Sequence, residues 1–195
     1  MIKLFNLYEY ICQLIKHYLN SRVYKDFGPG SIIGKQLILT HKSCISIGKS
    51  VMIYPNNRLE LIKKYSNQTF LPELIVGDFS QIHQNCHITC ADKIELGQSV
   101  IIVSNVTITD IIHPYDDISM PINASSIITK PVKIGDETYI YNNSVILPGT
   151  TIGRHCVIGA NSVVNSNIPD YSIAVGNPAR VVKQYNFVTK NWEKI

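Results

Sequence analysis

The stretch from Val132 to Val164 reads VKIGDETYIYNNSVILPGTTIGRHCVIGANSVV. Counted in steps of six, one column contains only β-branched aliphatic residues: Ile134, Ile140, Ile146, Ile152, Ile158 and Val164. Two places before the later members stands a second column of small residues: Thr138, Ser144, Thr150, Cys156 and Ser162. A helix repeats every 3.6 residues and a plain strand every 2, so neither accounts for a strict period of six. The period predicts an all-β solenoid of stacked coils, in which each coil buries its aliphatic column on the next.

The same column runs more weakly through the first half of the chain, where Ile33, Ile47 and Val76 are each followed by glycine. Two segments break it, residues 58–72 and residues 109–129. Loops that leave a rigid scaffold commonly carry functional residues, so we expect chemistry at 109–129. The predicted organisation is a helical segment at 1–27, the coil domain at 28–185, and a tail at 186–195. The tail is expected to form a short helix over the open end of the stack.

The first twenty residues place apolar side chains at helical spacing: Leu4, Leu7, Ile11, Leu14 and Tyr18. Charged and polar residues interrupt this stripe, so the segment is too polar to span a bilayer, and it has no signal-peptide cleavage pattern. We expect an amphipathic helix that packs on the coils or on a neighbouring subunit. Peripheral association with a membrane surface is the alternative.

Composition excludes several classes of protein. The formal charge is only +4 and no Lys/Arg run is present, so nucleic acid is not an expected partner. With 45% hydrophobic and 16% charged residues, the chain can bury a core and is not expected to be disordered. The five cysteines follow no disulfide spacing, which favours reduced thiols in a cytoplasmic protein.

One local cluster has the residue types of a metal site: His83, Cys86, His87 and Cys90. A zinc site needs four side chains that converge on one point. Cys86 instead falls in the small-residue column and is expected to point into the core, as is Cys156. We therefore predict no metal site.

Two stretches carry a family resemblance: KPVKIGDETYIYNNSVILPGTTIGRHCVIGANSVV and IPDYSIAVGNPARVVK. They resemble the hexapeptide-repeat acyltransferases, and within them the branch that O-acetylates sugars and bacterial polysaccharides. The resemblance is strong over residues 74–183 and thinner over 32–61. It implies a left-handed parallel β-helix, although general rules favour right-handed crossovers. It also implies a homotrimer that binds acetyl-CoA, as co-substrate, between neighbouring chains, with a sugar as the acceptor.

The resemblance places a catalytic histidine at His113, in the segment TDIIHPYDD of the long interruption. A sugar hydroxyl is a poor nucleophile, so transfer from a thioester needs a base that removes its proton as it attacks. An imidazole can accept a proton near neutral pH. Pro114 favours an extended backbone at His113, which helps to fix its direction. We predict direct transfer with His113 as general base and no acyl-enzyme.

Three further residues are candidates near the base. Asp110 and Asp116 are the nearest carboxylates in sequence and are candidates for orienting the imidazole. Asn85 falls where many sugar acetyltransferases of this family have an asparagine near the acceptor, although asparagine is also an ordinary turn residue.

The resemblance also implies contacts to the cofactor, from the coil around residues 159–162 and from the Gly-Asn-Pro-Ala turn that follows it. The candidate cofactor-binding residues are Tyr139, Asn142, Ala160, Asn165, Gly176, Pro178, Arg180 and Lys183. Arg180 and Lys183 are expected to meet the phosphates of coenzyme A. Two positions depart from the family pattern: Tyr139-Ile140-Tyr141 replaces Trp-Ile-Gly, and Asn165-Ser166 replaces Thr-Lys.

The residues leave more than one function open. The first is an acetyl-CoA-dependent O-acetyltransferase acting on a sugar or a surface polysaccharide. The alternative is an N-acetyltransferase of an amino sugar or nucleotide sugar on the same fold. A zinc-dependent β-helix enzyme needs several histidines at matched coil positions, and the spacing here fits that reading poorly.

Overall fold

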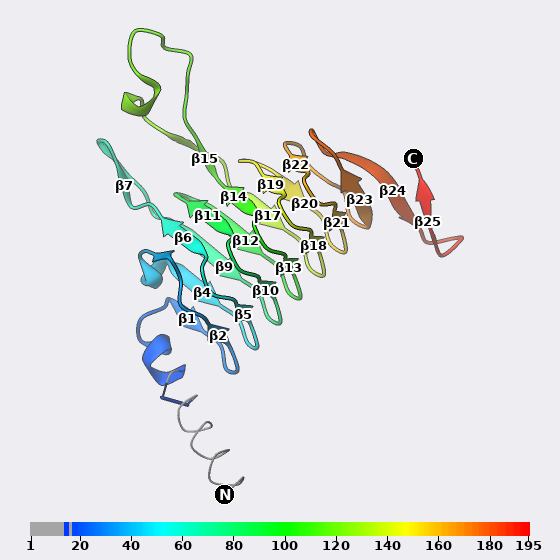
Figure 1. The fold of residues 1–195 in the computed structure, drawn as a ribbon, viewed down its shortest axis with the longest axis horizontal. Helices are drawn as coiled ribbons and strands as arrows, with labels where there is room; N and C mark the ends of the chain where they lie inside the picture. The colour runs from blue at the N-terminus through cyan, green and yellow to red at the C-terminus, as the bar shows by residue number, and fades with distance from the viewer. Residues whose placement is uncertain (1–13, 16) are drawn as a thin grey trace, which may run out of the picture.

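A computed structural model describes residues 14–15 and 17–195. The chain winds through three parallel sheets in strict rotation, here called sheets A, B and C, to build a three-sided stack of coils (Figure 1). Strand pairs between coils join members of the aliphatic column, Ile140 with Ile158 within the regular repeat and Ile102 with Ile140 across the interruption. The prediction of stacked, mainly parallel β coils is therefore confirmed in its architecture.

Most strands are two to four residues long. Sheet A contains β1 (Asp26–Phe27), β4 (Ile45–Ile47), β9 (Glu73–Val76), β12 (Lys93–Leu96), β17 (Val132–Ile134) and β20 (Thr151–Ile152). Sheet B contains β2 (Ile32–Ile33), β5 (Met52–Ile53), β10 (Gln81–Ile82), β13 (Ile101–Ile102), β18 (Tyr139–Ile140), β21 (Val157–Ile158), β23 (Ser172–Val175), β24 (Arg180–Asn186) and β25 (Asn191–Lys194). Sheet C contains β3 (Ile38–Leu39), β6 (Arg58–Leu61), β11 (His87–Cys90), β14 (Thr107–Thr109), β19 (Val145–Ile146) and β22 (Val163–Val164).

The remaining elements lie outside the three sheets. Two antiparallel pairs leave the stack, β7 (Lys64–Tyr65) with β8 (Gln68–Thr69) and β15 (Ile111–Ile112) with β16 (Ile128–Thr129). Two 3-10 turns are η1 (Lys42–Cys44) and η2 (Ile122–Ala124). Residues 17–21 are helical and lie at the N-terminal end of the stack, whereas the predicted stripe residues Leu4, Leu7 and Ile11 lie outside the described residues. Among the described residues, no helix has the length and apolar character to cross a bilayer.

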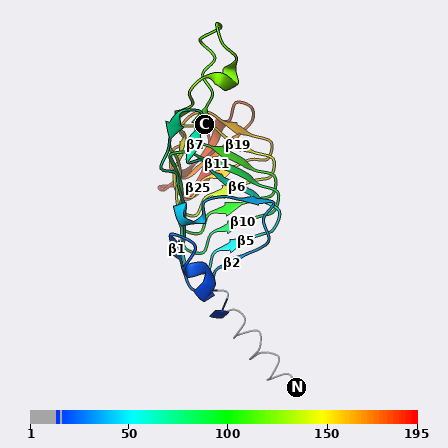
Figure 2. The ribbon, with the colours of Figure 1, turned by 90° about the vertical axis from the view of Figure 1, so that its left-hand side faces the viewer.

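The three corners of the stack differ in length. Every corner from sheet A to sheet B has four residues, for example 48–51 between β4 and β5, and so does every corner from B to C, for example 54–57. Corners from sheet C to sheet A vary from the two residues 91–92 to the long excursion of 110–131. Both predicted interruptions therefore leave the stack at this single C–A corner. Figure 2, a view turned by 90°, also shows the longer one projecting beyond the coils.

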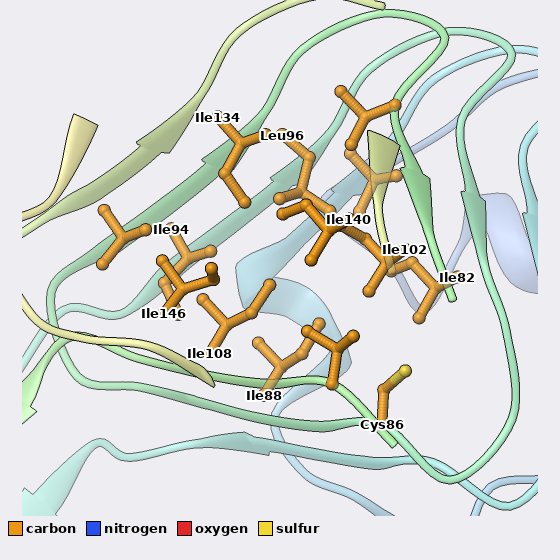
Figure 3. Close-up of a cluster of buried hydrophobic side chains, with 14 of the residues drawn as sticks. Ile82, Cys86, Ile88, Ile94, Leu96, Ile102, Ile108, Ile134, Ile140 and Ile146 are labelled. Atoms are coloured by element: carbon orange, nitrogen blue, oxygen red, sulfur yellow. The ribbon is translucent and has the colours of Figure 1, made fainter. Parts of the chain in front are cut away.

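The core is the aliphatic column read from the sequence. Its members from three sheets meet along the axis of the stack and are fully buried, as Figure 3 shows for Ile102, Ile108 and Ile134. Burying each such side chain contributes about 1.5–3 kcal/mol. Cys86 and Cys156 are buried at their predicted inward positions, and burial raises the pKa of the Cys86 thiol to about 11.

Buried hydroxyls connect one coil to the next. Thr138 Oγ1 donates to the carbonyl of Gly153 at 2.8 Å and accepts the backbone N–H of Cys156 at 3.1 Å. Ser80 makes the same pair of bonds with Gly97 and Val100. Each hydroxyl thus satisfies backbone groups that the corner leaves unpaired, which explains why the small-residue column is polar at these positions.

The predicted C-terminal helix is wrong. After β23 the chain turns back, and β24 and β25 add two antiparallel strands to sheet B. Side chains alternate along β24, and Tyr185 on this strand packs against Trp192 of β25, with ring centroids 5.5 Å apart. An exposed sheet edge presents unpaired N–H and C=O groups, and an added strand satisfies these groups whereas a helix does not.

Coil stacking at the A–B corner generates the first testable prediction. A Cβ on Gly77 would lie 2.4 Å from the carbonyl oxygen of Gly97 in the next coil, and neither backbone can move without shifting a sheet. We expect Gly77→Ala to lower the free energy of unfolding by about 3 kcal/mol. The exposed corner residue Gln98 is the control, and Gln98→Ala should change this free energy by less than about 0.5 kcal/mol. Equal effects of the two substitutions in urea denaturation would contradict the prediction.

Candidate active site

The long excursion at the C–A corner forms a lobe, defined here as residues 111–129, that carries His113. The lobe begins and ends in the antiparallel pair β15–β16, in which Ile111 pairs with Thr129 and Ile112 with Ile128. His113 follows β15 directly and is exposed outside the stack. His113 therefore lies one residue beyond a strand that fixes where the chain leaves the coils. Figure 1 shows the lobe projecting from the stack beyond β15.

The β7–β8 hairpin of the other interruption lies against the lobe. The ring of Tyr65 on β7 meets the imidazole of His113 edge to face, with centroids 5.5 Å apart and planes inclined by 70°. The Tyr65 hydroxyl donates to the carbonyl of Asn123 at 3.0 Å. The structure thus brings the two interruptions of the repeat into contact. Nothing in the sequence pattern indicated that Tyr65 would be the contact residue.

Asp110 lies at the root of the lobe and is fully buried. Its carboxylate accepts the backbone N–H of Ala91 at 2.9 Å and that of Asp92 at 2.8 Å, in the neighbouring coil. Burial raises the pKa of this carboxyl above its ordinary value, against the lowering effect of the two N–H bonds. The structure thus does not bring Asp110 to the imidazole as an orienting partner; the side chain instead ties the lobe to the stack.

Asp116 is exposed on the lobe. No hydrogen bond or ion pair joins a carboxylate to His113 among the described residues. The aromatic edge of Tyr65 is therefore the contact that the structure offers for holding the ring.

Asn85 occupies the B–C corner of its coil. It has φ +62°, and Asn56, Asn105, Asn143 and Asn161 hold the same left-handed conformation at the equivalent corners. Neighbouring members are hydrogen-bonded, Asn105 to Asn143 at 3.1 Å and Asn143 to Asn161 at 3.0 Å. Asparagine tolerates this conformation better than other side chains except glycine, so the corner itself accounts for Asn85. Its predicted place near an acceptor stays a prediction.

Several predicted cofactor residues share this same B–C corner. Because Ile140, Ile158 and Ala174 are aligned in sheet B, Asn142 and Ala160 follow at the same step of successive coils, and Gly176 follows at that step where the chain turns into β24. Ala160 and Gly176 are exposed and Asn142 is half-buried.

The other predicted cofactor residues lie outside this column. Tyr139, on the outer face of sheet B, packs against Tyr141 with centroids 4.7 Å apart. Pro178 lies in the turn between β23 and β24, and β24 then carries Arg180, which is exposed, and Lys183, which is half-buried. Asn165 lies at the C–A corner, on the opposite edge of sheet C.

The candidate groups therefore form two sets on one chain. The column that ends at Gly176 lies along the B–C corner, and the lobe with His113 leaves from the C–A corner. Sheet C separates them. A cavity of about 430 Å³ lies elsewhere, at the N-terminal end of the stack between Asn20, Tyr24 and Lys42, and it is far along the chain from both sets.

No three His, Cys, Asp or Glu side chains converge on a metal-sized site within the described part of the chain. His83 pairs with Tyr54, at 4.8 Å between ring centroids, and His87 Nε2 lies 2.9 Å from the Thr89 hydroxyl. Cys90 is buried beside Asp110, and burial raises the pKa of its thiol. The four side chains of the cluster His83, Cys86, His87 and Cys90 therefore lie in different environments.

Each coil is built from three six-residue segments, one on each sheet, and this repeat is shared with known proteins. The family described as bacterial transferase hexapeptide (six repeats) matches residues 131–166. A probable acetyltransferase of Mycobacterium tuberculosis is 49% identical over 100 residues, which cover 51% of this chain and 32% of the relative. The putative lipopolysaccharide biosynthesis O-acetyl transferase WbbJ of Escherichia coli is 34% identical over 128 residues, covering 62% of this chain and 65% of the relative.

A solved structure extends the likeness over most of the chain. The maltose O-acetyltransferase from Clostridium difficile is 30% identical, with a TM-score of 0.62, covering 85% of this chain and 72% of that one. The chain belongs to the hexapeptide-repeat acyltransferase family. It spans about a third of the mycobacterial relative and about two thirds of WbbJ.

The role of Asp110 can be tested with two substitutions. Asp110→Ala removes the acceptor and leaves two buried N–H groups unpaired, so we expect it to lower the free energy of unfolding by about 2–4 kcal/mol. Asp110→Asn keeps an acceptor oxygen without the charge, and should cost less than half as much. Urea denaturation gives both values. If Asp110 instead oriented His113 through its charge, Asp110→Asn would fold normally and lose at least about a hundredfold in acetyl transfer.

Proposed function

We propose that the protein is an acetyl-CoA-dependent O-acetyltransferase that acts on a hydroxyl of a sugar or a surface polysaccharide. The observation that carries this proposal is the placement of His113, followed by proline, on a lobe outside the coils with its ring against Tyr65. The names of WbbJ and the maltose enzyme support O-acetyl transfer to a saccharide as the reaction.

In the proposed reaction, His113 accepts the proton of the acceptor hydroxyl as its oxygen attacks the acetyl carbonyl carbon of the thioester. The tetrahedral intermediate that forms carries its negative charge on the former carbonyl oxygen, where backbone N–H groups can stabilise it. Its collapse breaks the C–S bond, and the imidazolium returns the proton to the departing thiolate. The products are the O-acetyl sugar and free coenzyme A, and no acyl-enzyme forms.

We place the donor along the B–C corner. Asn142, Ala160 and Gly176 form a column that can follow an extended pantetheine arm, since each contributes from a successive coil. Arg180 and Lys183 follow the turn that contains Pro178 and offer cations for the phosphates. Tyr139 and Asn165 complete the set, although Asn165 lies on the other edge of sheet C.

The separation of the two sets supports a site shared between chains. One chain would supply the donor corner and its neighbour the lobe, with the acceptor held between them. We accordingly propose a homotrimer of left-handed coils, as the family resemblance implies. The described cysteines are free thiols, which is consistent with a cytoplasmic enzyme. Peripheral membrane association through the N-terminal segment remains a separate hypothesis.

Substitution of the base tests the central step. We expect His113→Ala to lower kcat by about 10²–10⁴-fold, the usual contribution of a general base, with the KM for acetyl-CoA little changed. His83, which pairs with Tyr54 at the B–C corner, is the matched histidine, and His83→Ala should stay within about threefold. Thiol release from acetyl-CoA, measured with a panel of sugars, nucleotide sugars and amines, provides the assay. Wild-type rates for His113→Ala would refute the proposed base, and turnover confined to amines would favour N-acetylation.

Arg180 tests the donor end. Its guanidinium is exposed and, among the residues that the structure describes, donates only to the adjacent backbone carbonyl of Ala179, at 2.9 Å, so its substitution removes little from the fold. A charge-assisted hydrogen bond contributes about 1.5–3 kcal/mol, so Arg180→Ala should raise the KM for acetyl-CoA roughly tenfold or more with kcat nearly constant. Arg22, at the other end of the stack, supplies the control variant Arg22→Ala. An unchanged KM would show that the phosphates of coenzyme A do not bind at Arg180 on β24.

A further inference from the structure

The two hairpins leave the stack at the same corner but from different coils. Leu61, where β6 ends, is aligned with Cys90, and the alignment of Thr89 with Thr109 puts Asp110 beside Cys90 in the next coil. The coil between them turns tightly through Ala91 and Asp92 and sends nothing outward. The hairpin roots are therefore two coils apart, roughly 10 Å at the usual strand spacing, and side chains must bridge that gap.

Three contacts bridge it. The Gln68 side-chain amide donates to the carbonyl of Ile127 at 3.0 Å and accepts the N–H of the same residue at 2.7 Å, so it pairs with the lobe as a neighbouring strand would. Ile127 is only 3% exposed. The Tyr65 hydroxyl bonds Asn123, and the Tyr65 ring meets His113. The hairpin thus contacts both the outer part and the returning arm of the lobe.

The lobe has little else to hold it. Its own sheet is two residues long on each side, and Tyr115 and Ile118 are 72% and 98% exposed. An isolated two-stranded hairpin is at best marginally stable in water. Asp110 ties its root to the stack but lies three residues before His113, so it fixes where the lobe starts and not where the imidazole points.

We propose that the β7–β8 hairpin is the positioning element of the active site, with Tyr65 and Gln68 as positioning residues for His113. Gln68 holds the returning arm of the lobe, and the T-shaped contact with the Tyr65 ring restricts the rotation of the imidazole. This inference rests on the proposed function of His113 as the base. A base displaced by about 1 Å from its productive geometry can lose about a hundredfold in rate, so these contacts set the rate without touching the substrate.

The first experiment separates the ring from the hydroxyl of Tyr65. Tyr65→Leu should lower kcat at least tenfold and leave the KM for acetyl-CoA within twofold, because Tyr65 contacts His113 and Asn123 and none of the proposed donor residues of its own chain. Tyr65→Phe keeps the ring, so its kcat should stay within about threefold of the wild-type value. The Tyr54–His83 pair is the matched control, and Tyr54→Leu should leave kcat within threefold. Equal kcat for Tyr65→Leu and wild type would overturn the proposal.

A double-mutant cycle tests whether Tyr65 acts through the imidazole. In the His113→Ala background, Tyr65→Leu should change the residual rate less than threefold, because no base remains to be positioned. Structural damage alone would multiply the two losses, and that result would also overturn the proposal. A fully active His113→Ala variant would show that the proposed base is wrong. A wild-type rate in Tyr65→Leu, with His113→Ala impaired, would show that the positioning role of Tyr65 is wrong and leave the base in place.

The second experiment does not depend on activity. The amide of Ile127 donates to Gln68, so Gln68→Ala should speed its hydrogen exchange at least tenfold while the amides of β14 and β17 keep their protection. Gln36 makes a comparable set of backbone bonds near the N-terminal end, and Gln36→Ala should leave the exchange of Ile127 unchanged. Unaltered exchange at Ile127 in Gln68→Ala would show that the hairpin does not hold the lobe.

Discussion

The close stacking of one coil on the next at the A–B corner constrains everything else in this protein. A Cβ on Gly97 would lie 2.3 Å from Asp136 Oδ1 and 2.8 Å from the backbone nitrogen of Asp136 in the coil above, so the first position of this corner has no room for a side chain. The B–C corner is restricted as well, since residues such as Asn105 and Asn143 hold left-handed backbone there. Only the C–A corner can change its length, and both hairpins that build the candidate site leave the stack at that corner.

This restriction also determines how the site is divided. The invariant B–C corner keeps Asn142, Ala160 and Gly176 in strict register, as an extended donor requires. The variable corner carries the proposed base on a projection that reaches beyond its own coils. The width of sheet C separates the two sets, and in the proposed trimer a neighbouring chain supplies the other half of the site.

The sequence predicted the parts of the structure that repeat. A column with a period of six was enough to place Ile140 and Ile158 in the core and Cys86 beside them, because each coil imposes the same environment at the same step. The C-terminal tail was predicted wrongly because a cap belongs to no period. The sequence of β24 does not alternate between apolar and polar residues, since Val182 is exposed and Lys183 is half-buried, and the open edge of sheet B decided the outcome.

The candidate site was predictable only in part, for the same reason. His113 could be placed on a lobe from the break in the repeat and from the family resemblance, but Asp110 was interpreted as an acid near the base by its proximity in sequence. The structure turns its side chain into the stack, toward Ala91 and Asp92. Tyr65 could not have been predicted, since its contact joins two insertions across 48 residues and no periodicity describes either of them.

These two kinds of contact give the protein two separable properties. The stability of the stack comes from buried columns and corner packing, which the hairpins do not share. The position of the imidazole comes from Tyr65 and Gln68, which contribute little buried area to the core. A substitution in the β7–β8 hairpin can therefore lower the reaction rate while the stack stays folded. A substitution that loosens the A–B corner instead lowers the stability of the stack first. The rate of this enzyme would then depend on contacts that lie entirely outside its repeat.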